Sequence, residues 1–195
     1  MRGRCATRRE DTMTTRAEYA TLPVMQRLAC LGHTPEDLAA AMRGQSDTTL
    51  SCRPGAKHWS AKEVICHLRD IEEQFILRFR TMLAMDDPTF LTLGDMPPHL
   101  SAWGLTAGDG LPLDPDRWAE ERQYLRHDTG AALDAFGRRR AETLAFLHKL
   151  TPAQWQRGSI HPTLGRMTFD DWITHIAVHD ANHVAQLQRA LRGQP

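Results

Sequence analysis

Apolar residues recur every three or four positions over five stretches of the chain, which is the spacing of amphipathic helices. The pattern predicts helices over residues 17–31, 35–43, 60–86, 117–149 and 168–192. The first two are compatible with one long element bent at Gly32 and Pro35, and the fourth has a potential break near Gly130. Leu and Ala dominate the apolar residues, whereas Val and Ile together number only ten, a bias that favours helices over sheets.

Motifs that cap helix N-termini stand at the head of several of these stretches. Ser60 and Glu63 have the spacing of a capping box, in which each side chain satisfies a free backbone N–H of the first turn. The same spacing occurs in Thr151-Pro152-Ala153-Gln154 and, in a looser acidic form, in Thr168-Phe169-Asp170-Asp171. Thr34 before Pro35 predicts a further start, because proline fits the first helical position.

Residues 87–116 interrupt the helical pattern with nine Pro and Gly residues. An irregular connection of about 30 residues is uncommon and often functional, and Phe90 and Trp103 indicate that it packs onto the body. We therefore predict an all-α fold, a four-helix bundle with one long irregular crossover loop. Residues 1–15 show no periodicity and are predicted to form a flexible tail, with Met13 as an alternative natural start. One bundle domain follows over residues 16–195.

The charges of the chain cancel, since 24 Lys and Arg residues stand against 24 Asp and Glu residues in 195. This balance argues against nucleic acid or a membrane as the partner, and no apolar run is long enough to cross a bilayer. The cluster Arg138-Arg139-Arg140 is interpreted as a solvated face, because consecutive helical residues point in different directions. The four scattered cysteines do not form a disulfide framework and no secretory signal is present, so we predict a cytoplasmic protein with free thiols.

Two of the ten histidines interrupt the apolar stripe of the last predicted helix. That stripe consists of Trp172, Ile176, Leu187 and Ala190. His179 and His183 fall inside it, four residues apart and one above the other, so that together they can bind one metal ion. His175 is also four residues from His179, but it lies towards the edge of the stripe, and we therefore prefer the pair His179 and His183.

A third candidate ligand, His67, lies at the rim of the apolar stripe of the helix predicted over 60–86, where a neighbouring helix would face it. Three histidines from two helices leave coordination positions open, as in catalytic metal sites. Asp70, one turn later, is a candidate acceptor for the second N–H of His67, and Gln186 is a candidate hydrogen-bond partner of a metal-bound water. The alternative is a set of core histidines satisfied by carboxylates, with Asp70 exposed to solvent.

The remaining candidates have weaker patterns. Cys66 adjoins His67 but points about 100° away from it, so it is interpreted as a small packing residue and neither a ligand nor a nucleophile. Five histidines without partner spacing are interpreted as surface or loop residues: His58, His99, His127, His148 and His161.

Two segments resemble the DinB-like superfamily, which includes bacillithiol and mycothiol S-transferases. The run His58-Trp59-Ser60-Ala61-Lys62-Glu63-Val64-Ile65-Cys66-His67-Leu68-Arg69-Asp70 is similar to its second helix. The segment from Gly165 to Gln186 is similar to its last helix, and the resemblance covers about residues 15–192. It implies a four-helix bundle that holds a divalent metal, Zn or Ni, through His67, His179 and His183.

The resemblance also implies a function, thiol transfer. A bacillithiol-like, low-molecular-weight thiol bound at the metal loses its proton, and the thiolate then attacks a small electrophile. Homodimers are common in the superfamily, and the resemblance implies one here. It does not imply a particular catalytic residue. The first alternative is a non-catalytic, metal-stabilised bundle that binds small molecules or acts in a stress response.

The second alternative is a metal-dependent hydrolase, because His179-Asp180-Ala181-Asn182-His183 differs from a His-Glu-x-x-His motif in its acidic residue. Asp is one methylene shorter than Glu and reaches less well towards a metal-bound water. Only twelve residues follow His183, which leaves no room for a third ligand downstream. We therefore favour the hydrolase least.

Overall fold

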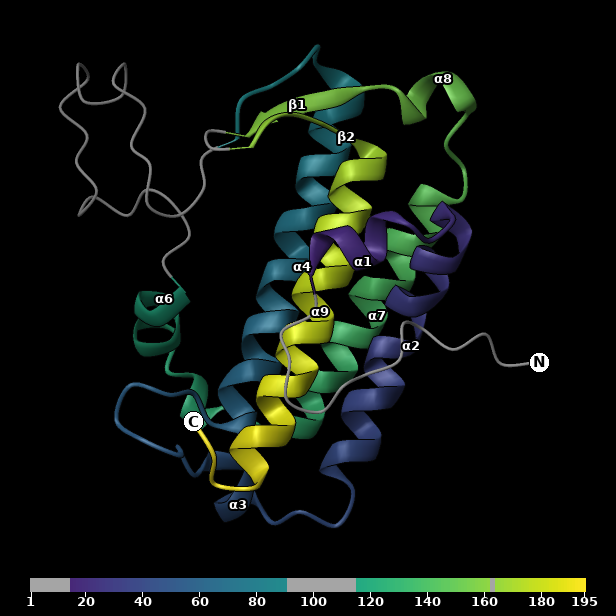
Figure 1. The fold of residues 1–195 in the computed structure, drawn as a ribbon. Helices are drawn as coiled ribbons and strands as arrows, with labels where there is room; N and C mark the ends of the chain where they lie inside the picture. Colours follow the sequence, from purple (N-terminus) through teal and green to yellow (C-terminus); the bar gives the residue numbers. More distant parts are fainter. Residues whose placement is uncertain (1–14, 91–114, 162–163) are drawn as a thin grey trace, which may run out of the picture.

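Four long helices form the body of the protein (Figure 1), as described by a computed structural model for residues 15–90, 115–161 and 164–195. They are α2 (Val24–Met42), α4 (Ala61–Ala84), α7 (Thr129–Leu147) and α9 (Phe169–Leu191). The shorter elements are α1 (Arg16–Ala20), α3 (Asp47–Ser51), α6 (Pro115–Glu121), the 3-10 helix η1 (Tyr124–Arg126), α8 (Pro152–Trp155), β1 (Gly158–His161) and β2 (Gly165–Thr168). The predicted helical bundle is confirmed. None of the described helices combines the length and apolar character that a membrane span requires.

Each long helix packs against two others, in the cyclic order α2, α9, α4, α7. The backbone of Thr89, just after α4, pairs with Ile160 of β1, just after α7, so α4 and α7 end at the same side of the bundle. α9 starts at that side and runs back. The side chain of Arg27 in the first turn of α2 contacts Asp170 in the first turn of α9, so these two helices are parallel. The bundle therefore contains two parallel pairs, α2 with α9 and α4 with α7 (Figure 1).

The helix starts follow the capping motifs of the sequence. The capping boxes at Ser60, Thr151 and Thr168 are all formed, each with both reciprocal hydrogen bonds. The stretch 117–149 is nevertheless divided into the end of α6, the 3-10 helix η1 and α7. Gln123 adopts a left-handed conformation with φ of 52°, and Asp128 caps α7 by accepting a hydrogen bond from the Ala131 N–H. The break therefore precedes Gly130.

The first predicted helices are divided differently in the structure. The helix expected over 17–31 is interrupted, since α1 ends at Ala20 and Pro23 is the N-cap residue of α2. α2 then continues through Gly32 and Pro35, where the sequence predicted a bend or a new start. Thr34 does not cap a helix; its hydroxyl donates to Asp180 Oδ2 at 3.0 Å and so links α2 to α9.

A two-stranded hairpin, which the helical pattern did not predict, lies across one end of α4 and α9 (Figure 1). β1 and β2 are antiparallel, with Gly158 opposite Thr168 and His161 opposite Gly165. Gly158 is required there, because a Cβ atom would lie 2.9 Å from the Met167 carbonyl oxygen. The hairpin leads directly into α9. Of the predicted crossover, residues 91–114 lie outside the described part of the chain, as do residues 1–14 of the predicted tail and Met13 within it.

Two further expectations need correction. Cys52 and Cys66 are free, as expected, but Cys30 is disulfide-bonded. The arginine cluster is not a solvated face as a whole, because Arg140 is only 2% exposed while Arg138 is exposed.

Arg140 of α7 connects all four long helices. Its Nη1 donates to Asp180 Oδ2 of α9 at 2.6 Å and to the Leu31 carbonyl of α2 at 2.9 Å, and its Nη2 donates to Glu72 Oε2 of α4 at 2.6 Å. Pro35 has no N–H with which to bond the Leu31 carbonyl, four residues earlier. Arg140 supplies the missing donor, which explains why α2 continues through this proline.

Substitution of Arg140 is expected to destabilise the bundle strongly. Arg140→Met leaves Glu72 and Asp180 as buried carboxylates without their counter-charge, a change that typically costs about 3–5 kcal/mol. The free energy of unfolding from urea denaturation measures it. Arg138→Met, at the exposed neighbouring position, should change the stability by no more than about 0.5 kcal/mol. Equal stability of both variants would contradict this role of Arg140.

Candidate metal centre

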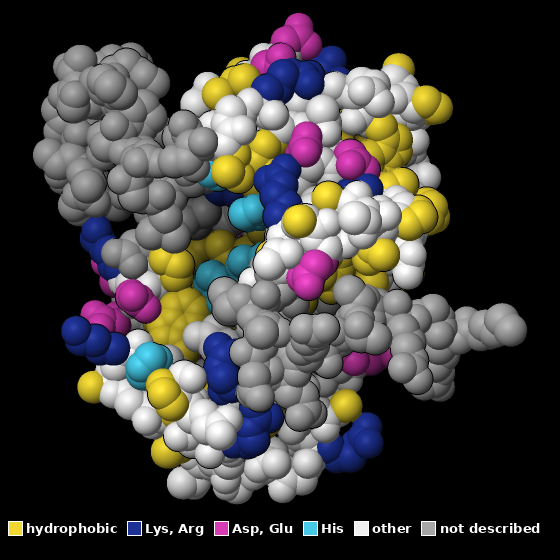
Figure 2. Space-filling model, viewed as in Figure 1, with side chains coloured by type: hydrophobic (Ala, Val, Ile, Leu, Met, Phe, Trp, Pro, Cys, Tyr) yellow, Lys and Arg dark blue, Asp and Glu magenta, His cyan; other side chains and the backbone are white. Residues whose placement is uncertain are grey.

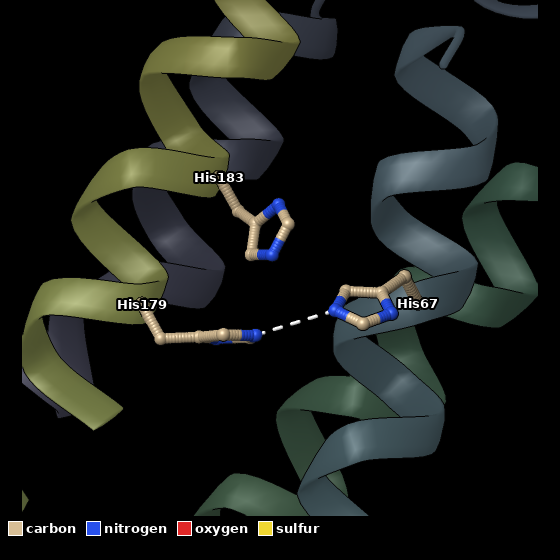
Figure 3. Close-up of side chains that lie close together, drawn as sticks. All are labelled: His67, His179 and His183. Carbon is tan, nitrogen blue, oxygen red and sulfur yellow. Dashed lines mark hydrogen bonds between the residues drawn. The ribbon is translucent and has the colours of Figure 1, made fainter. Parts of the chain in front are cut away.

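The structure brings the side chains of His67, His179 and His183 together in the bundle interior (Figure 3). His67 comes from α4, and the other two occupy successive turns of α9. The candidate ligand nitrogens all lie within 4.8 Å of one another, and His67 Nε2 is 3.2 Å from His179 Nε2. Among the described residues this is the group of His, Cys, Asp and Glu side chains that meets the geometry of a metal site. His175 lies outside the cluster.

The two histidines of α9 are each oriented through Nδ1. Gln186 Oε1 lies 2.7 Å from His183 Nδ1, and Asp180 Oδ1 lies 3.4 Å from His179 Nδ1. Both partners are hydrogen-bond acceptors, so each Nδ1 carries the hydrogen and each Nε2 presents its lone pair. Gln186 thus contacts the ring of His183, whereas the sequence suggested that it would bind a metal-bound water.

Asp70 does not have the role expected for it. Its Oδ1 accepts from Arg69 Nε at 2.7 Å, and its Oδ2 accepts from Arg122 Nη1 at 2.6 Å and from the Tyr124 hydroxyl at 2.9 Å. The Nδ1 atom of His67 is buried without a hydrogen-bond partner. The predicted hydrogen bond between His67 and Asp70 is therefore wrong, and Asp70 is buried in an arginine-rich cluster instead of being solvated.

Burial disfavours the charged form of two of the three rings. It lowers the pKa of His67 well below 6.5, and the neighbouring His183 and His179 lower it further. Burial, together with the proximity of His179, lowers the pKa of His183 to about 3. Both rings are neutral near pH 7, and a neutral imidazole is the form that binds a metal.

The donor set fits a divalent cation. Two imidazole nitrogens that share a tetrahedral zinc ion at about 2.0–2.1 Å lie about 3.3 Å apart, and the nitrogens of His67 and His179 are 3.2 Å apart. Three imidazoles are a ligand set of catalytic sites, in which the fourth position is left for water or substrate. Imidazole suits several divalent metals, so the donors alone do not select between Zn and Ni.

A cavity of about 330 Å³ opens beside the cluster. Its described lining consists of Trp59, His67, Ile71, Phe75, Arg78, Pro115, His161, His175, His179 and His183. Figure 2 shows histidine and hydrophobic side chains gathered in a hollow on this face of the molecule. Trp59 lies against the cluster, with ring centroids 4.9 Å from His67 and 6.2 Å from His183. None of the described lining residues is an Asp or Glu.

Sequence reasoning missed three of these lining residues. His161 was interpreted as a surface or loop residue but is 8% exposed and lies on β1. Since the hairpin was not predicted, there was no reason to place His161 near the cavity. Arg78 did leave a signal, because it follows Ile71 by seven residues and so interrupts the apolar stripe of α4 within about 20° of Ile71. Trp59 precedes its helix and carried no periodic signal.

Cys66 has the role that the sequence predicted, a small packing residue. Its side chain is fully buried in the core, on the side of η1, and burial raises the pKa of the thiol to about 11. A thiol with such a pKa stays protonated near pH 7 and is a poor nucleophile.

A four-helix bundle with three histidines from two of its helices, open to an interior cavity, defines a class of metal-binding bundle proteins. The sequence profile of the DinB superfamily matches residues 31–187, which is most of the chain. The protein therefore belongs to the DinB superfamily, as the resemblance of its two helix segments predicted.

The sequence comparison and the structure comparison both match the same protein of Bacillus subtilis, YfiT. The chain is 22% identical over 163 residues to the "Putative metal-dependent hydrolase YfiT" of Bacillus subtilis (strain 168). This alignment covers 83% of this chain and 80% of that protein. The solved structure of YfiT from Bacillus subtilis, described as a probable metal-dependent hydrolase with an unusual four-helix bundle topology, matches with a TM-score of 0.71. The identity there is 21%, over 87% of this chain and 86% of the other. At this identity the structural match establishes the shared fold.

The contact between Gln186 and His183 predicts a measurable contribution to metal affinity. Loss of a partner that orients a ligating histidine typically lowers the metal affinity by a factor of about 10–100. Gln186→Leu should therefore raise the dissociation constant for zinc by this factor. Competition with a chromophoric chelator measures the affinity. Gln188→Leu is the matched control, because Gln188 follows Gln186 by two residues and therefore lies on a different face of the same helix. This variant should bind zinc as tightly as the parent does. An unchanged affinity of Gln186→Leu would contradict the orienting role.

His175 predicts a loss of stability in acid for the metal-free protein. Burial, followed by His179 and His161, lowers its pKa to about 4 in the folded state, whereas an unfolded histidine titrates near 6.5. Between these pH values the unfolded chain binds a proton that the folded chain does not, so the stability falls as the pH falls through this window. The urea midpoint of His175→Gln should therefore drop less between pH 7 and pH 4.5 than that of the parent. His58→Gln, at an exposed position, should drop as the parent does; an identical drop in all three proteins would rule out His175 as a source.

Proposed function

We propose that the protein binds a divalent metal through His67, His179 and His183 and acts as a thiol-dependent S-transferase on a small electrophile. A divalent cation at this site would stabilise the thiolate form of a low-molecular-weight thiol, which is the nucleophilic form. The observation that carries the proposal is the opening of three imidazole groups onto a cavity of about 330 Å³. A site that served only stability would not need this space.

The residues of the chain have separate tasks in this proposal. The three imidazoles supply nitrogen donors, and Asp180 and Gln186 hold two of them in the orientation that presents Nε2. Trp59 and Phe75 limit the access of water to the cluster, with the Phe75 ring centroid 5.9 Å from that of His179. The sulfur forms a bond to the electrophilic carbon, whose leaving group departs with the electron pair of the broken bond.

The names of the relatives favour a second candidate, metal-dependent hydrolysis. A hydrolase of the His-Glu-x-x-His type needs a carboxylate base that reaches the water at the metal. Asp180 holds the corresponding place in the sequence, but it is 2% exposed, accepts hydrogen bonds from Arg140 and Thr34, and does not line the cavity. Burial acts to raise its pKa, but the charge of Arg140 and the contact with His179 lower it to about 2. Asp180 is therefore a support for His179 and a poor proton acceptor. A thiol bound as its thiolate needs no such base.

The experiment that tests the proposal uses cobalt(II)-loaded protein with cysteine as the thiol and 1-chloro-2,4-dinitrobenzene as the electrophile. We expect about one equivalent of metal, a sulfur-to-cobalt charge-transfer band on addition of cysteine, and metal-dependent release of chloride. His183→Ala should lose the metal and both signals, whereas His148→Ala, at an exposed position, should keep them.

The outcomes separate the candidates. Metal binding without a thiolate band excludes the thiol-dependent function, and hydrolysis of 4-nitrophenyl acetate by that protein would favour the hydrolase. A stoichiometric metal that His183→Ala retains would move the site away from the three histidines. The predicted cytoplasmic location, homodimer and stress-response role, and the absence of nucleic acid and membrane partners, stay predictions.

A further inference from the structure

We propose that the electrophile of this protein is an electron-poor aromatic compound, which binds by stacking its ring on the indole of Trp59. The reaction of that compound rests on the proposed function, whereas the stacking site rests on the geometry of the cavity. Trp59 precedes α4 and lines the cavity beside the three-histidine cluster.

Flat rings make up most of the cavity wall. Of its ten described lining residues, Trp59, Phe75 and five histidines carry an aromatic ring, and Ile71 and Pro115 add aliphatic surface. A wall of this kind favours a flat, largely apolar ligand, because such a ligand can contact the faces and edges of several rings at once. The volume of about 330 Å³ lies within the range of small-molecule sites.

The two large rings of the wall differ in what surrounds them. Phe75 is 3% exposed, its ring is perpendicular to that of His179, and the Arg78 guanidinium carbon lies 5.9 Å from its centroid. Trp59 is only half-buried, and the rings next to it are two smaller imidazoles of the cluster. Because an indole is larger than an imidazole, part of the Trp59 ring surface is left for a ligand.

The indole of Trp59 is held in one orientation. Its Nε1 donates to Asp116 Oδ1, in the first turn of α6, at 2.8 Å, and the neighbouring Pro115 also lines the cavity. The indole plane is nearly parallel to the imidazole of His183, with an angle of 9° between them. The hydrogen bond uses the edge of the indole and leaves its faces for stacking. A ring that is already fixed loses little conformational entropy when a ligand binds to it.

The electrostatics of this site favour a neutral, electron-poor ring. The face of an aromatic ring is negative and its edge is positive, so stacking on an indole is strongest for a ring with electron-withdrawing substituents. A cation is another partner of indole faces. The ring centroid of Trp59 is 4.9 Å from that of His67, however, so a divalent ion at the cluster would repel a cationic ligand.

Electron withdrawal is also what makes an aromatic ring reactive towards a thiolate. In an aryl halide, the sulfur forms a bond to the ring carbon that carries the halogen. The halide departs with the electron pair of the carbon–halogen bond. The ring that stacks best on Trp59 is therefore also the ring that reacts most readily with the thiolate of the proposed function.

The test measures the binding of three unreactive probes to cobalt(II)-loaded protein by calorimetry. Nitrobenzene is flat and electron-poor, anisole is flat and electron-rich, and nitrocyclohexane carries the same nitro group on a ring that is not flat. We expect nitrobenzene to bind about three- to tenfold more tightly than the other two, which is the factor that a favourable aromatic pair contributes.

Variants assign the preference to Trp59. Trp59→Leu should abolish the preference for nitrobenzene. Trp59→Phe, which keeps an aromatic face, should retain part of it and guards against a folding defect in the first variant. Trp118→Leu is the control with the same change of residue type, because Trp118 lies in α6 and is not among the described lining residues. This control should keep the preference of the parent.

The outcomes separate the stacking site from the proposed function. No binding of nitrobenzene, equal affinities for the three probes, or a preference that Trp59→Leu retains would overturn the stacking site and leave the metal and thiol site intact. If the protein takes up no metal, or if no thiol binds to the cobalt, the proposed function fails. The same titration of that protein then decides on the stacking site alone, which a preference removed by Trp59→Leu would support.

Discussion

The fold depends on one buried cation, the guanidinium of Arg140. It is held by Glu72 and Asp180, and it donates to the carbonyl that Pro35 leaves without a partner. Burial acts to lower the pKa of Arg140, but the two carboxylates outweigh this effect and keep it protonated. Because its partners come from the three other long helices, the arrangement fixes the lateral position of each helix in the bundle. Apolar packing alone would allow the helices to slide by small amounts, whereas charged hydrogen bonds in a low dielectric have a narrow geometry.

Arg140 is connected to the candidate metal centre through one residue, Asp180. Asp180 binds Arg140 with one carboxylate oxygen and faces His179 with the other. The orientation of a metal ligand is thus linked to the contact that holds the bundle together. This arrangement explains why an acidic residue next to His179 is not in the cavity. A carboxylate that supports an imidazole must lie behind the ring, and the base of a hydrolase must lie in front of it.

The sequence predicted the bundle and the three-histidine cluster because both depend on helical periodicity. His67, His179 and His183 occupy inward positions of long helices, and such positions follow from a repeat of 3.6 residues. The hairpin was missed because its strands have four residues each and show no usable alternation. Because the hairpin was not predicted, the position of His161 at the cavity was not predicted either. The sequence left open whether one helix continues past Pro35, and it could not decide this, since the donor that permits the continuation lies 109 positions from Leu31 along the chain. The role of Asp70 was misjudged because its actual partners Arg122 and Tyr124 lie beyond the long crossover.

The separation of the histidines along the chain has a consequence for biosynthesis. His67 and His179 are 112 residues apart, and α9, which carries two of the three candidate ligands, is synthesised after the other three described long helices. Until α9 docks, His67 lacks the other two donors and Arg140 lacks one of its two carboxylates. A nascent chain therefore has little means of capturing a metal early and trapping a misfolded state around it. Metal uptake would follow the completion of the bundle, and metal binding would then stabilise only chains that have reached the native topology.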